Sequence, residues 1–291
     1  MTAARVASAR QVFFANRSVP IAQQADLERA FFKSLSLANG THKTTAPARL
    51  KDVDQVLARH AKKGEVIRLL DVGISSGITT LELLDALEEG GIRVTGTGVD
   101  ICTRGVFLSL LGIDILLDPA GNLLQIATPF FTRGRPHHTQ KSFKSKMLRF
   151  VMDWIDASGV GAWILRSRCA RELPLVSPRL LSRPNFSVVE RDISLPMPAW
   201  NESFDVIRAA NILNLEYFSP SQLAIMLRNI SSWLKSDGII AVCRTDPLDG
   251  RNDGSFYRKR ARYLDEVHRL GRGSEVNALI NERFCKNIRQ S

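Results

Sequence analysis

The stretch Val66-Ile67-Arg68-Leu69-Leu70-Asp71-Val72-Gly73-Ile74-Ser75-Ser76-Gly77 decides the fold, because its character changes within one short segment. The apolar first half predicts a buried strand, and the glycines and serines that follow predict a tight turn. From Thr79 to Leu87 apolar residues recur at helical spacing, so a helix follows the turn. A second apolar run, Arg93 to Val99, ends in Asp100. Strand, turn, helix and strand form a βαβ unit, which implies a parallel sheet.

Further strands are expected at residues 186–190, 204–209 and 239–244. Ser219-Pro220-Ser221-Gln222 predicts the start of a helix between the last two, because it supplies an N-cap, an N1 proline and an N3 amide. This order of elements predicts an α/β protein with a Rossmann-like, mostly parallel sheet. In the segment after Ser255, Gly271-Arg272-Gly273 predicts a turn.

Three segments are expected along the chain. Residues 1–63 form a helical N-terminal arm, residues 64–112 with 184–291 form the Rossmann-like core, and residues 113–183 form an insertion. An insertion is expected because a crossover between parallel strands needs far fewer residues than this one has. It contains a predicted hairpin at 113–126 and a predicted amphipathic helix at 144–156, whose apolar stripe consists of Met147, Phe150, Val151, Trp154 and Ile155.

The net charge of +11 is concentrated in two regions. Residues 132–183 hold 11 Lys and Arg against three acids, and residues 251–291 hold ten against five. Such regions attract phosphate esters, nucleic acid or acidic lipid head groups, although a solvated face that only maintains solubility has the same composition.

The composition, with 44% hydrophobic and 24% charged residues, is that of a globular protein. No apolar run approaches the ~20 residues of a membrane span. The cysteines at 102, 169, 243 and 285 have neither zinc-site nor disulfide spacing, so a cytoplasmic protein without a metal is expected. The first 25 residues carry arginines and no acid, which favours a basic arm over an organelle transit peptide.

A glycine-bearing turn between a strand and a helix allows close approach of a ligand to the backbone, and the helix N-terminus offers free N–H groups. A dinucleotide site is disfavoured here, because Ser75 and Ile78 replace its second and third glycines. A hydrolase nucleophile elbow, G-x-S-x-G, matches residues 73–77, with Asp246 and His268 in the required order. No oxyanion loop precedes it, so this interpretation is also disfavoured.

The third interpretation comes from a resemblance to the class I S-adenosylmethionine-dependent methyltransferases, whose first motif is an apolar run, an acid and a glycine-rich turn. Residues 203–208 and 234–239 resemble that family's fourth strand and the approach to its fifth. The resemblance covers residues 64–112 and 184–280. It implies S-adenosylmethionine as the cofactor and a Rossmann-like methyltransferase sheet that ends in an antiparallel hairpin.

The same resemblance implies a set of cofactor-binding residues: Asp71, Gly73, Ser75, Gly77, Asp100, Asp192 and Ile193. Asp71 and the turn amides would hold the amino acid end, Asp100 the ribose hydroxyls, and Asp192 with Ile193 the adenine. A carboxylate is suited to accept both ribose hydroxyls. The alternatives are strand-end carboxylates that cap turns, or an exposed ion pair for Asp192. Ser75 departs from the glycine that is common at its position.

The sulfonium is an activated methyl donor, so alignment and exclusion of water matter more than a dedicated base. Asn211 and Asn214 follow the fourth core strand and are candidates for orienting the nucleophile, with a role in a turn as the alternative. His137 and His138 are candidates for a base on a lid, although an exposed polar turn is favoured for both. No Asn-Pro-Pro-Tyr type motif follows the fourth strand, which disfavours methylation of base amines.

The leading hypothesis is an enzyme that methylates oxygen or nitrogen of a small, anionic metabolite held under the basic insertion. An RNA methyltransferase is the first alternative, in which Phe130, Phe131, Phe143 and Trp154 stack on bases. A catalytically silent scaffold with a methyltransferase fold is the second, and the intact turn residues disfavour it. Peripheral contact with an anionic membrane through the arm and the insertion is a further hypothesis.

Overall fold

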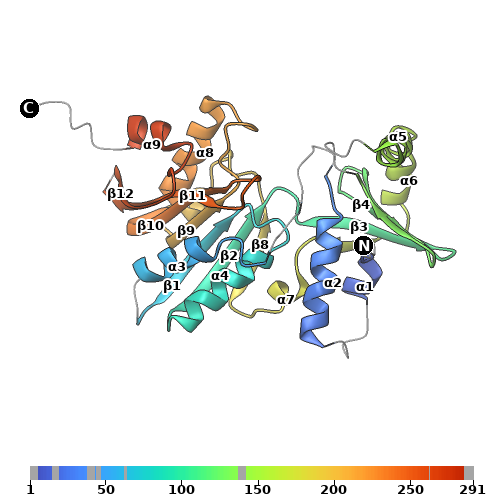
Figure 1. The fold of residues 1–291 in the computed structure, drawn as a ribbon, viewed down its shortest axis with the longest axis horizontal. Helices are drawn as coiled ribbons and strands as arrows, with labels where there is room; N and C mark the ends of the chain where they lie inside the picture. The colour runs from blue at the N-terminus through green and yellow to red at the C-terminus, as the bar shows by residue number, and fades with distance from the viewer. Residues whose placement is uncertain are drawn as a thin grey trace, which may run out of the picture. The chain divides into compact units, whose positions relative to one another are not determined.

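The structure of the protein is a computed structural model, which describes residues 6–14, 20–37, 43, 47–61, 64–136, 142–261 and 263–284. The chain forms two compact units (Figure 1). The core unit consists of Pro47–Ile101 and Leu180–Ser291, and the accessory unit consists of Met1–Ala46 and Cys102–Arg179.

A seven-stranded sheet in the order β12-β11-β10-β9-β1-β2-β8 forms the centre of the core unit. The strands from β10 to β8 are parallel, and β11 runs antiparallel to both of its neighbours. The predicted Rossmann-like α/β fold with its antiparallel end is therefore confirmed. The strands are β1 (Val66–Val72), β2 (Arg93–Asp100), β8 (Phe186–Glu190), β9 (Phe204–Ala210), β10 (Leu234–Thr245), β11 (Asn252–Arg260) and β12 (Tyr263–Leu270).

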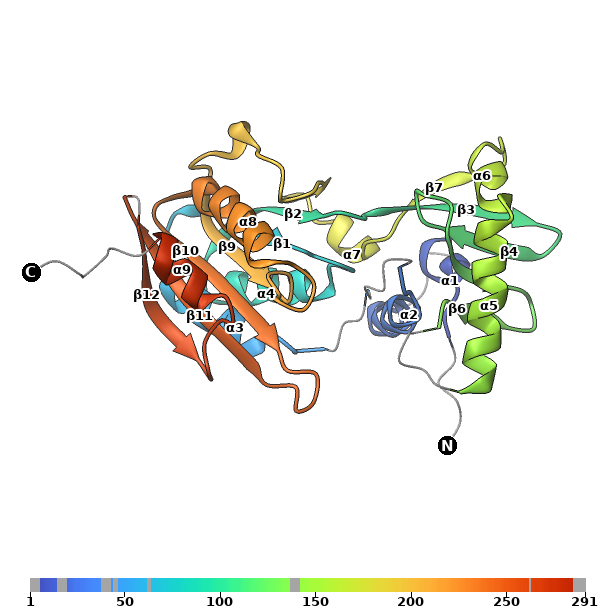
Figure 2. The ribbon, with the colours of Figure 1, turned by 90° about the horizontal axis from the view of Figure 1, so that it is seen from above.

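Helices cover both faces of this sheet (Figure 2). One face carries α3 (Lys51–His60) and α4 (Ile78–Glu89), and the other carries α8 (Pro220–Trp233) and α9 (Asn277–Phe284). Helix α8 begins as predicted, because the Ser219 side chain and the Gln222 side chain each accept the other residue's backbone N–H. Its buried side packs into the core with Leu70, Val72 and Ile240. The short helices α7 (Pro178–Leu181) and η1 (Pro198–Trp200) lie in connections.

Strand register brings the carboxyl ends of four parallel strands to one edge of the sheet. Val72 of β1 lies between Val99 of β2 and Ala209 of β9, and Ala210 lies beside Cys243 of β10. In open parallel sheets, ligands bind outside this edge. The turn after β1, Asp100 at the end of β2 and the segment after β9 therefore lie next to one another at this edge of the sheet.

The accessory unit contains a five-stranded antiparallel sheet in the order β6-β5-β4-β3-β7. Gln125 of this sheet accepts the Ala9 N–H at 2.9 Å and donates to the Ala7 carbonyl at 3.0 Å, which fixes the N-terminal helix on it. The elements are α1 (Ala9–Phe13), α2 (Ile21–Lys33), β3 (Arg104–Leu110), β4 (Ile113–Leu117), β5 (Leu123–Ala127), β6 (Thr132–Gly134), α5 (Phe143–Ala157), α6 (Val160–Leu165) and β7 (Arg171–Pro174).

The two units divide the chain differently from the three expected segments. Strand β3 falls in the expected core segment, yet it pairs with β4 and β7 of the antiparallel sheet. The expected arm also divides, because α1 packs in the accessory unit whereas α3 packs against α4 and β10 of the core unit. The predicted hairpin at 113–126 is present as β4 and β5.

The predicted apolar stripe of the inserted helix lies mostly on its exposed side, and only Ile155 of the stripe packs inward. In α5, Met152 is buried against Leu108, Leu117 and Leu123, whereas Phe150 and Trp154 are exposed. The helix has apolar residues on two sides, so periodicity alone does not decide which side meets the sheet. Packing selects the side of Leu148, Met152 and Ile155.

Within the ranges that the structure describes, no helix has both the length and the hydrophobicity that a bilayer-spanning segment needs. The same ranges contain no group of three or more His, Cys, Asp or Glu side chains placed to hold a metal ion.

Candidate functional site

The turn between β1 and α4 has the backbone conformation that its glycines predict. Gly73, Ser75 and Gly77 all have positive φ, at 72°, 55° and 75°. Gly77 is the N-cap of α4 and provides no side chain to the first N–H groups of the helix. Those N–H groups have no partner within the helix, so they are available to a negatively charged group at this edge.

Asp100 of β2 lies directly against this turn. Its Oδ2 accepts the Ser75 N–H at 2.8 Å, and the Gly73 N–H donates to the Val99 carbonyl at 2.8 Å. The structure therefore brings together four of the expected cofactor-binding residues, Gly73, Ser75, Gly77 and Asp100. The group that orients the Asp100 carboxylate is a backbone amide, which the turn itself holds in place.

The chain packs closely over the turn from the segment after β9. A Cβ built on Gly73 would lie 3.2 Å from the Cβ of Ile212, which is tighter than ordinary van der Waals contact. The positive φ of Gly73 further disfavours any larger residue. Gly73 thus allows Ile212 and the turn to approach each other.

The Asp71 carboxylate, beneath the turn, accepts hydrogen bonds from side chains of β9 and α4. Arg208 of β9 donates to both of its oxygens, at 2.9 and 2.6 Å, and the Thr80 hydroxyl donates at 2.7 Å. Arg208 also donates to Asp54 of α3 at 2.8 Å, and all three charged side chains are buried. The structure therefore places Asp71 in an internal ion cluster that joins β1, β9 and α3.

Burial and pairing shift the pKa values within this ion cluster in opposite directions. Burial raises the pKa of Asp54 to about 6, although the charge of Arg208 opposes the shift. Burial alone would lower the pKa of Arg208, but the charges of Asp71 and Asp54 outweigh it and raise that pKa. Arg208 is therefore cationic at every pH at which the protein folds, and two carboxylates share its charge.

Asp192 and Ile193 follow β8, beside the end of β2. Asp192 accepts the Ser194 N–H at 2.8 Å and is partly exposed. The Ile193 side chain belongs to the hydrophobic core, and its carbonyl accepts the Asn229 side-chain amide at 2.9 Å. Asp192 thus lies at the expected edge, whereas the side chain of Ile193 contributes to packing.

The two asparagines after β9 have their side-chain oxygens occupied. Oδ1 of Asn211 accepts the Thr245 N–H at 2.7 Å, and Oδ1 of Asn214 accepts the Glu216 N–H at 2.6 Å. Asn211 has a φ of 60°, so it also forms the sharp turn that ends the strand. His137 and His138 lie outside the described residues.

The nucleophile elbow is not assembled. His268 packs against Phe256 of the neighbouring strand, with ring centroids 5.5 Å apart, and Asp246 accepts a hydrogen bond from Arg272. Ser75 bonds through its amide to Asp100. The three residues therefore form no hydrolase triad.

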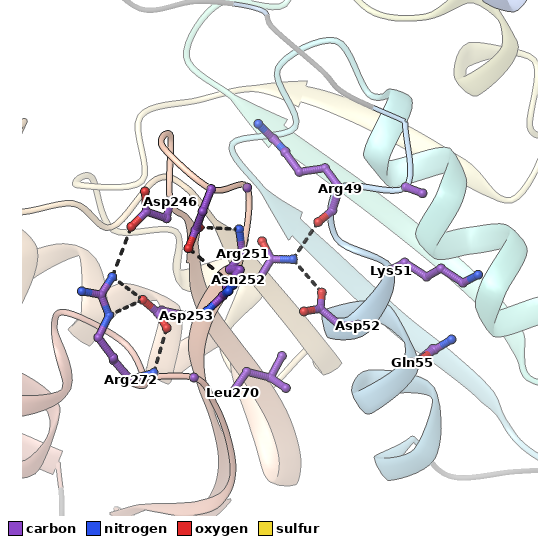
Figure 3. Close-up of a pocket in the computed structure, with 14 residues that line it drawn as sticks. Arg49, Lys51, Asp52, Gln55, Asp246, Arg251, Asn252, Asp253, Leu270 and Arg272 are labelled. Carbon is purple, nitrogen blue, oxygen red and sulfur yellow. Dashed lines mark hydrogen bonds and ion pairs between the residues drawn. The ribbon is translucent and has the colours of Figure 1, made fainter.

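A cavity of about 850 Å³ opens farther along the carboxyl edge of the sheet, between the start of α3 and the loops that follow β10 and β12 (Figure 3). Its lining does not include the turn residues or Asp100. Hydrogen bonds connect the end of β9 to this cavity: Asn211 bonds to Thr245, Thr245 to Asn252 at 2.8 Å, and Asn252 to Asp52 at 2.6 Å. Asn252 and Asp52 line the cavity.

The cations of this cavity differ in their partners. Arg272 pairs with Asp253 at 2.7 Å and Arg251 pairs with Asp249 at 3.4 Å. Among the described residues no acid forms an ion pair with Arg49 or Lys51, and the buried Nε of Arg49 donates no hydrogen bond. Burial and the nearby Arg208 lower the pKa of Arg49.

Sequence reasoning missed Arg49, Lys51 and Asn252 as site residues. Asn252 lies some 200 positions from Asp52 and Arg49 but bonds to both. Arg49 and Lys51 precede α3, and no local motif distinguishes them from other surface cations. The available signal was Asp246, which follows the strand at 239–244 and so had to lie at the carboxyl edge.

No protein-family model matches the chain. No curated protein matches its sequence.

Solved structures are similar to this chain at low sequence identity and low TM-score. The methyltransferase domain of the citrinin polyketide synthase is 15% identical, with a TM-score of 0.37 over 83% of this chain and 46% of that one. A SAM-dependent methyltransferase from Aquifex aeolicus is 13% identical, with a TM-score of 0.33 over 70% and 71%. The [4+2]-cyclase SpnF is 17% identical, with a TM-score of 0.34 over 76% and 53%. The chain thus spans about half the length of two of these three proteins.

The central parallel sheet and its antiparallel end give the core unit a Rossmann-like α/β fold, as the sequence predicted. The glycine turn lies beside Asp100 at the carboxyl edge of this sheet.

Proposed function

We propose that the protein is an S-adenosylmethionine-dependent methyltransferase that acts on a small anionic acceptor. The observation that carries this proposal is the contact between the Asp100 carboxylate and the Ser75 amide, at 2.8 Å. It places an acid of β2 beside a turn of positive φ and the uncapped start of α4. Donors for a carboxylate and acceptors for hydroxyls thus occur side by side.

In this proposal the turn from Gly73 to Gly77 and the first N–H groups of α4 hold the amino acid end of the cofactor. Asp100 accepts the ribose hydroxyls, and the segment of Asp192 and Ile193 lies along the adenine. Asp71 acts from below, because its bonds to Arg208 and Thr80 keep the end of β1 and the start of α4 in place. The bound cofactor supplies a methyl group on a sulfonium that is already activated.

The acceptor would enter from the side of the 850 Å³ cavity. Neither Arg49 nor Lys51 forms an ion pair with an acid of the described chain, although the charge of Glu82 acts on Arg49, so both favour an acceptor that carries a carboxylate or phosphate. Asn211 positions the end of β9 through its two bonds to Thr245, and in this proposal its side-chain amide orients the nucleophile. The chain's contribution is then alignment and exclusion of water.

Calorimetry with S-adenosylhomocysteine tests the cofactor part. We expect binding by the wild type, a loss of about tenfold or more in affinity for Asp100→Asn, and no change for Asp265→Asn, an exposed acid on β12. No binding by a folded wild-type sample would contradict the proposal and favour a catalytically silent scaffold.

Arg49→Met and Lys51→Met test the acceptor part. Both variants should keep their affinity for S-adenosylhomocysteine and lose methyl transfer to anionic acceptors. Unchanged transfer in both variants would show that this cavity does not hold the acceptor.

A further inference from the structure

Helix α5 of the accessory unit carries an apolar face that no part of the described chain covers. Its inner side packs on the antiparallel sheet through Met152. At 100° per residue, the opposite side collects residues spaced i, i+4, i+7, i+8 and i+11. These residues, here named the α5 face, are Phe143 (79% exposed), Met147 (56%), Phe150 (71%), Val151 (44%) and Trp154 (65%).

Basic residues accompany the α5 face. The first turn of α5 contains Lys144 and Lys146 and no acidic residue, and the exposed Lys146 lies one residue before Met147 of this face. Cations near a helix N-terminus oppose the helix dipole and so weaken the helix. Helix stability therefore does not account for these cations, and their charge attracts anionic surfaces.

The whole accessory unit has the same charge character. It holds 17 Lys and Arg against seven Asp and Glu, whereas the core unit holds 23 against 22. Ten of the eleven net positive charges therefore belong to the unit that presents the α5 face. A partner with a negative surface is attracted to this unit rather than to the core unit.

The chemistry of the exposed residues favours lipid over nucleic acid. Met147 and Val151 have no ring with which to stack on a base. The tip of the β3–β4 hairpin also exposes aliphatic side chains, Leu110 and Leu111, the latter 94% exposed. Aliphatic and aromatic side chains interspersed with Lys and Arg are typical of helices that lie in a membrane interface.

We propose that the accessory unit docks on the surface of an anionic lipid bilayer, with the α5 face inserted between the head groups. Lys and Arg around this face contact the lipid phosphates, and the phenyl and indole rings enter the boundary of the acyl chains. The inference does not depend on methyl transfer.

Vesicle flotation tests this proposal with the full chain. We expect the protein to float with phosphatidylcholine vesicles that contain about one third phosphatidylglycerol, and not with phosphatidylcholine alone. Trp154 and Trp163 are exposed, whereas Trp233 is buried and Trp200 packs in the core. Binding should therefore shift tryptophan emission to shorter wavelength, and Trp154→Phe should reduce that shift. Equal flotation with neutral vesicles would overturn the role of charge.

Paired variants distinguish insertion from nonspecific attraction. Phe150→Ala with Trp154→Ala should reduce affinity for the anionic vesicles about tenfold or more, because both rings leave the interface. Ile21→Ala removes an exposed apolar residue from α2 of the same unit and should change it less than about twofold. Equal vesicle affinity of the double variant and the wild type would overturn the proposal. So would tight binding to RNA in a protein that does not float.

Discussion

Asp54→Asn is expected to stabilise the core unit at neutral pH, although it removes one member of an ion pair. Asp54 lies with Asp71 around a single buried cation, Arg208. Burial outweighs the attraction of Arg208 and raises the pKa of Asp54 from 3.8 to about 6. An asparagine keeps an oxygen that accepts the bond from Arg208 and carries no charge that must be buried.

The magnitude follows from the pKa shift. A shift of two units corresponds to about 3 kcal/mol between the two protonation states. Because the folded-state pKa is raised, the folded protein binds more protons than the unfolded chain between about pH 4 and 6. Ionisation of Asp54 therefore lowers the free energy of unfolding as the pH rises through this window. In Asp54→Asn this decrease is absent.

Urea unfolding of the wild type and of Asp54→Asn over this pH range measures the effect. Fluorescence of Trp200 and Trp233 reports on the core unit if the exposed Trp154 and Trp163 are replaced by Phe in both proteins. The free energy of unfolding of the variant, relative to the wild type, should rise by about 3 kcal/mol from pH 4 to pH 7. A difference that stays constant, or that falls as the pH rises, would refute the reasoning, because Asp54 would then stabilise the fold in its charged form.

Three further results are expected. Arg208→Met leaves Asp54 and Asp71 buried without a cation and should reduce the free energy of unfolding by about 3–5 kcal/mol at neutral pH, measured by urea unfolding; a loss below about 1 kcal/mol would contradict the ion cluster. Gly96→Ala places a Cβ 2.4 Å from the Phe186 ring and should reduce that free energy by about 1–3 kcal/mol, an effect that Phe186→Leu should partly reverse in the double variant. Burial raises the pKa of the Cys243 thiol to about 12, so iodoacetamide at about pH 8 should modify the exposed Cys169 and leave Cys243 intact in native protein, as mass spectrometry would show; equal modification would mean that Cys243 is accessible.

The core elements were predictable because their signals are local. Apolar runs ending in Asp71-Val72 and in Asp100 mark β1 and β2, and the capping residues at 219–222 mark the start of α8. The proximity of Asp100 to the turn was predictable as well, since adjacent parallel strands end at one edge of a sheet.

Features that depend on distant contacts were not predictable in the same way. Arg208 lies in a strand, and an arginine at such a position is expected to be partly exposed. Its partners on β1 and α3 allow it to be buried. Helix α5 has two apolar sides, and only its packing on a sheet with no counterpart in the expected fold decides between them. Arg49 and Asn252 line the same 850 Å³ cavity and are hydrogen-bonded, although 203 positions separate them in the sequence.

A crystal structure with S-adenosylhomocysteine bound tests the central claim most directly. The account predicts that the ribose hydroxyls lie within hydrogen-bond distance of the Asp100 carboxylate, with the amino acid end against Gly73 to Gly77. Density for the ligand at any other place, such as the cavity lined by Arg49 and Asn252, would contradict it.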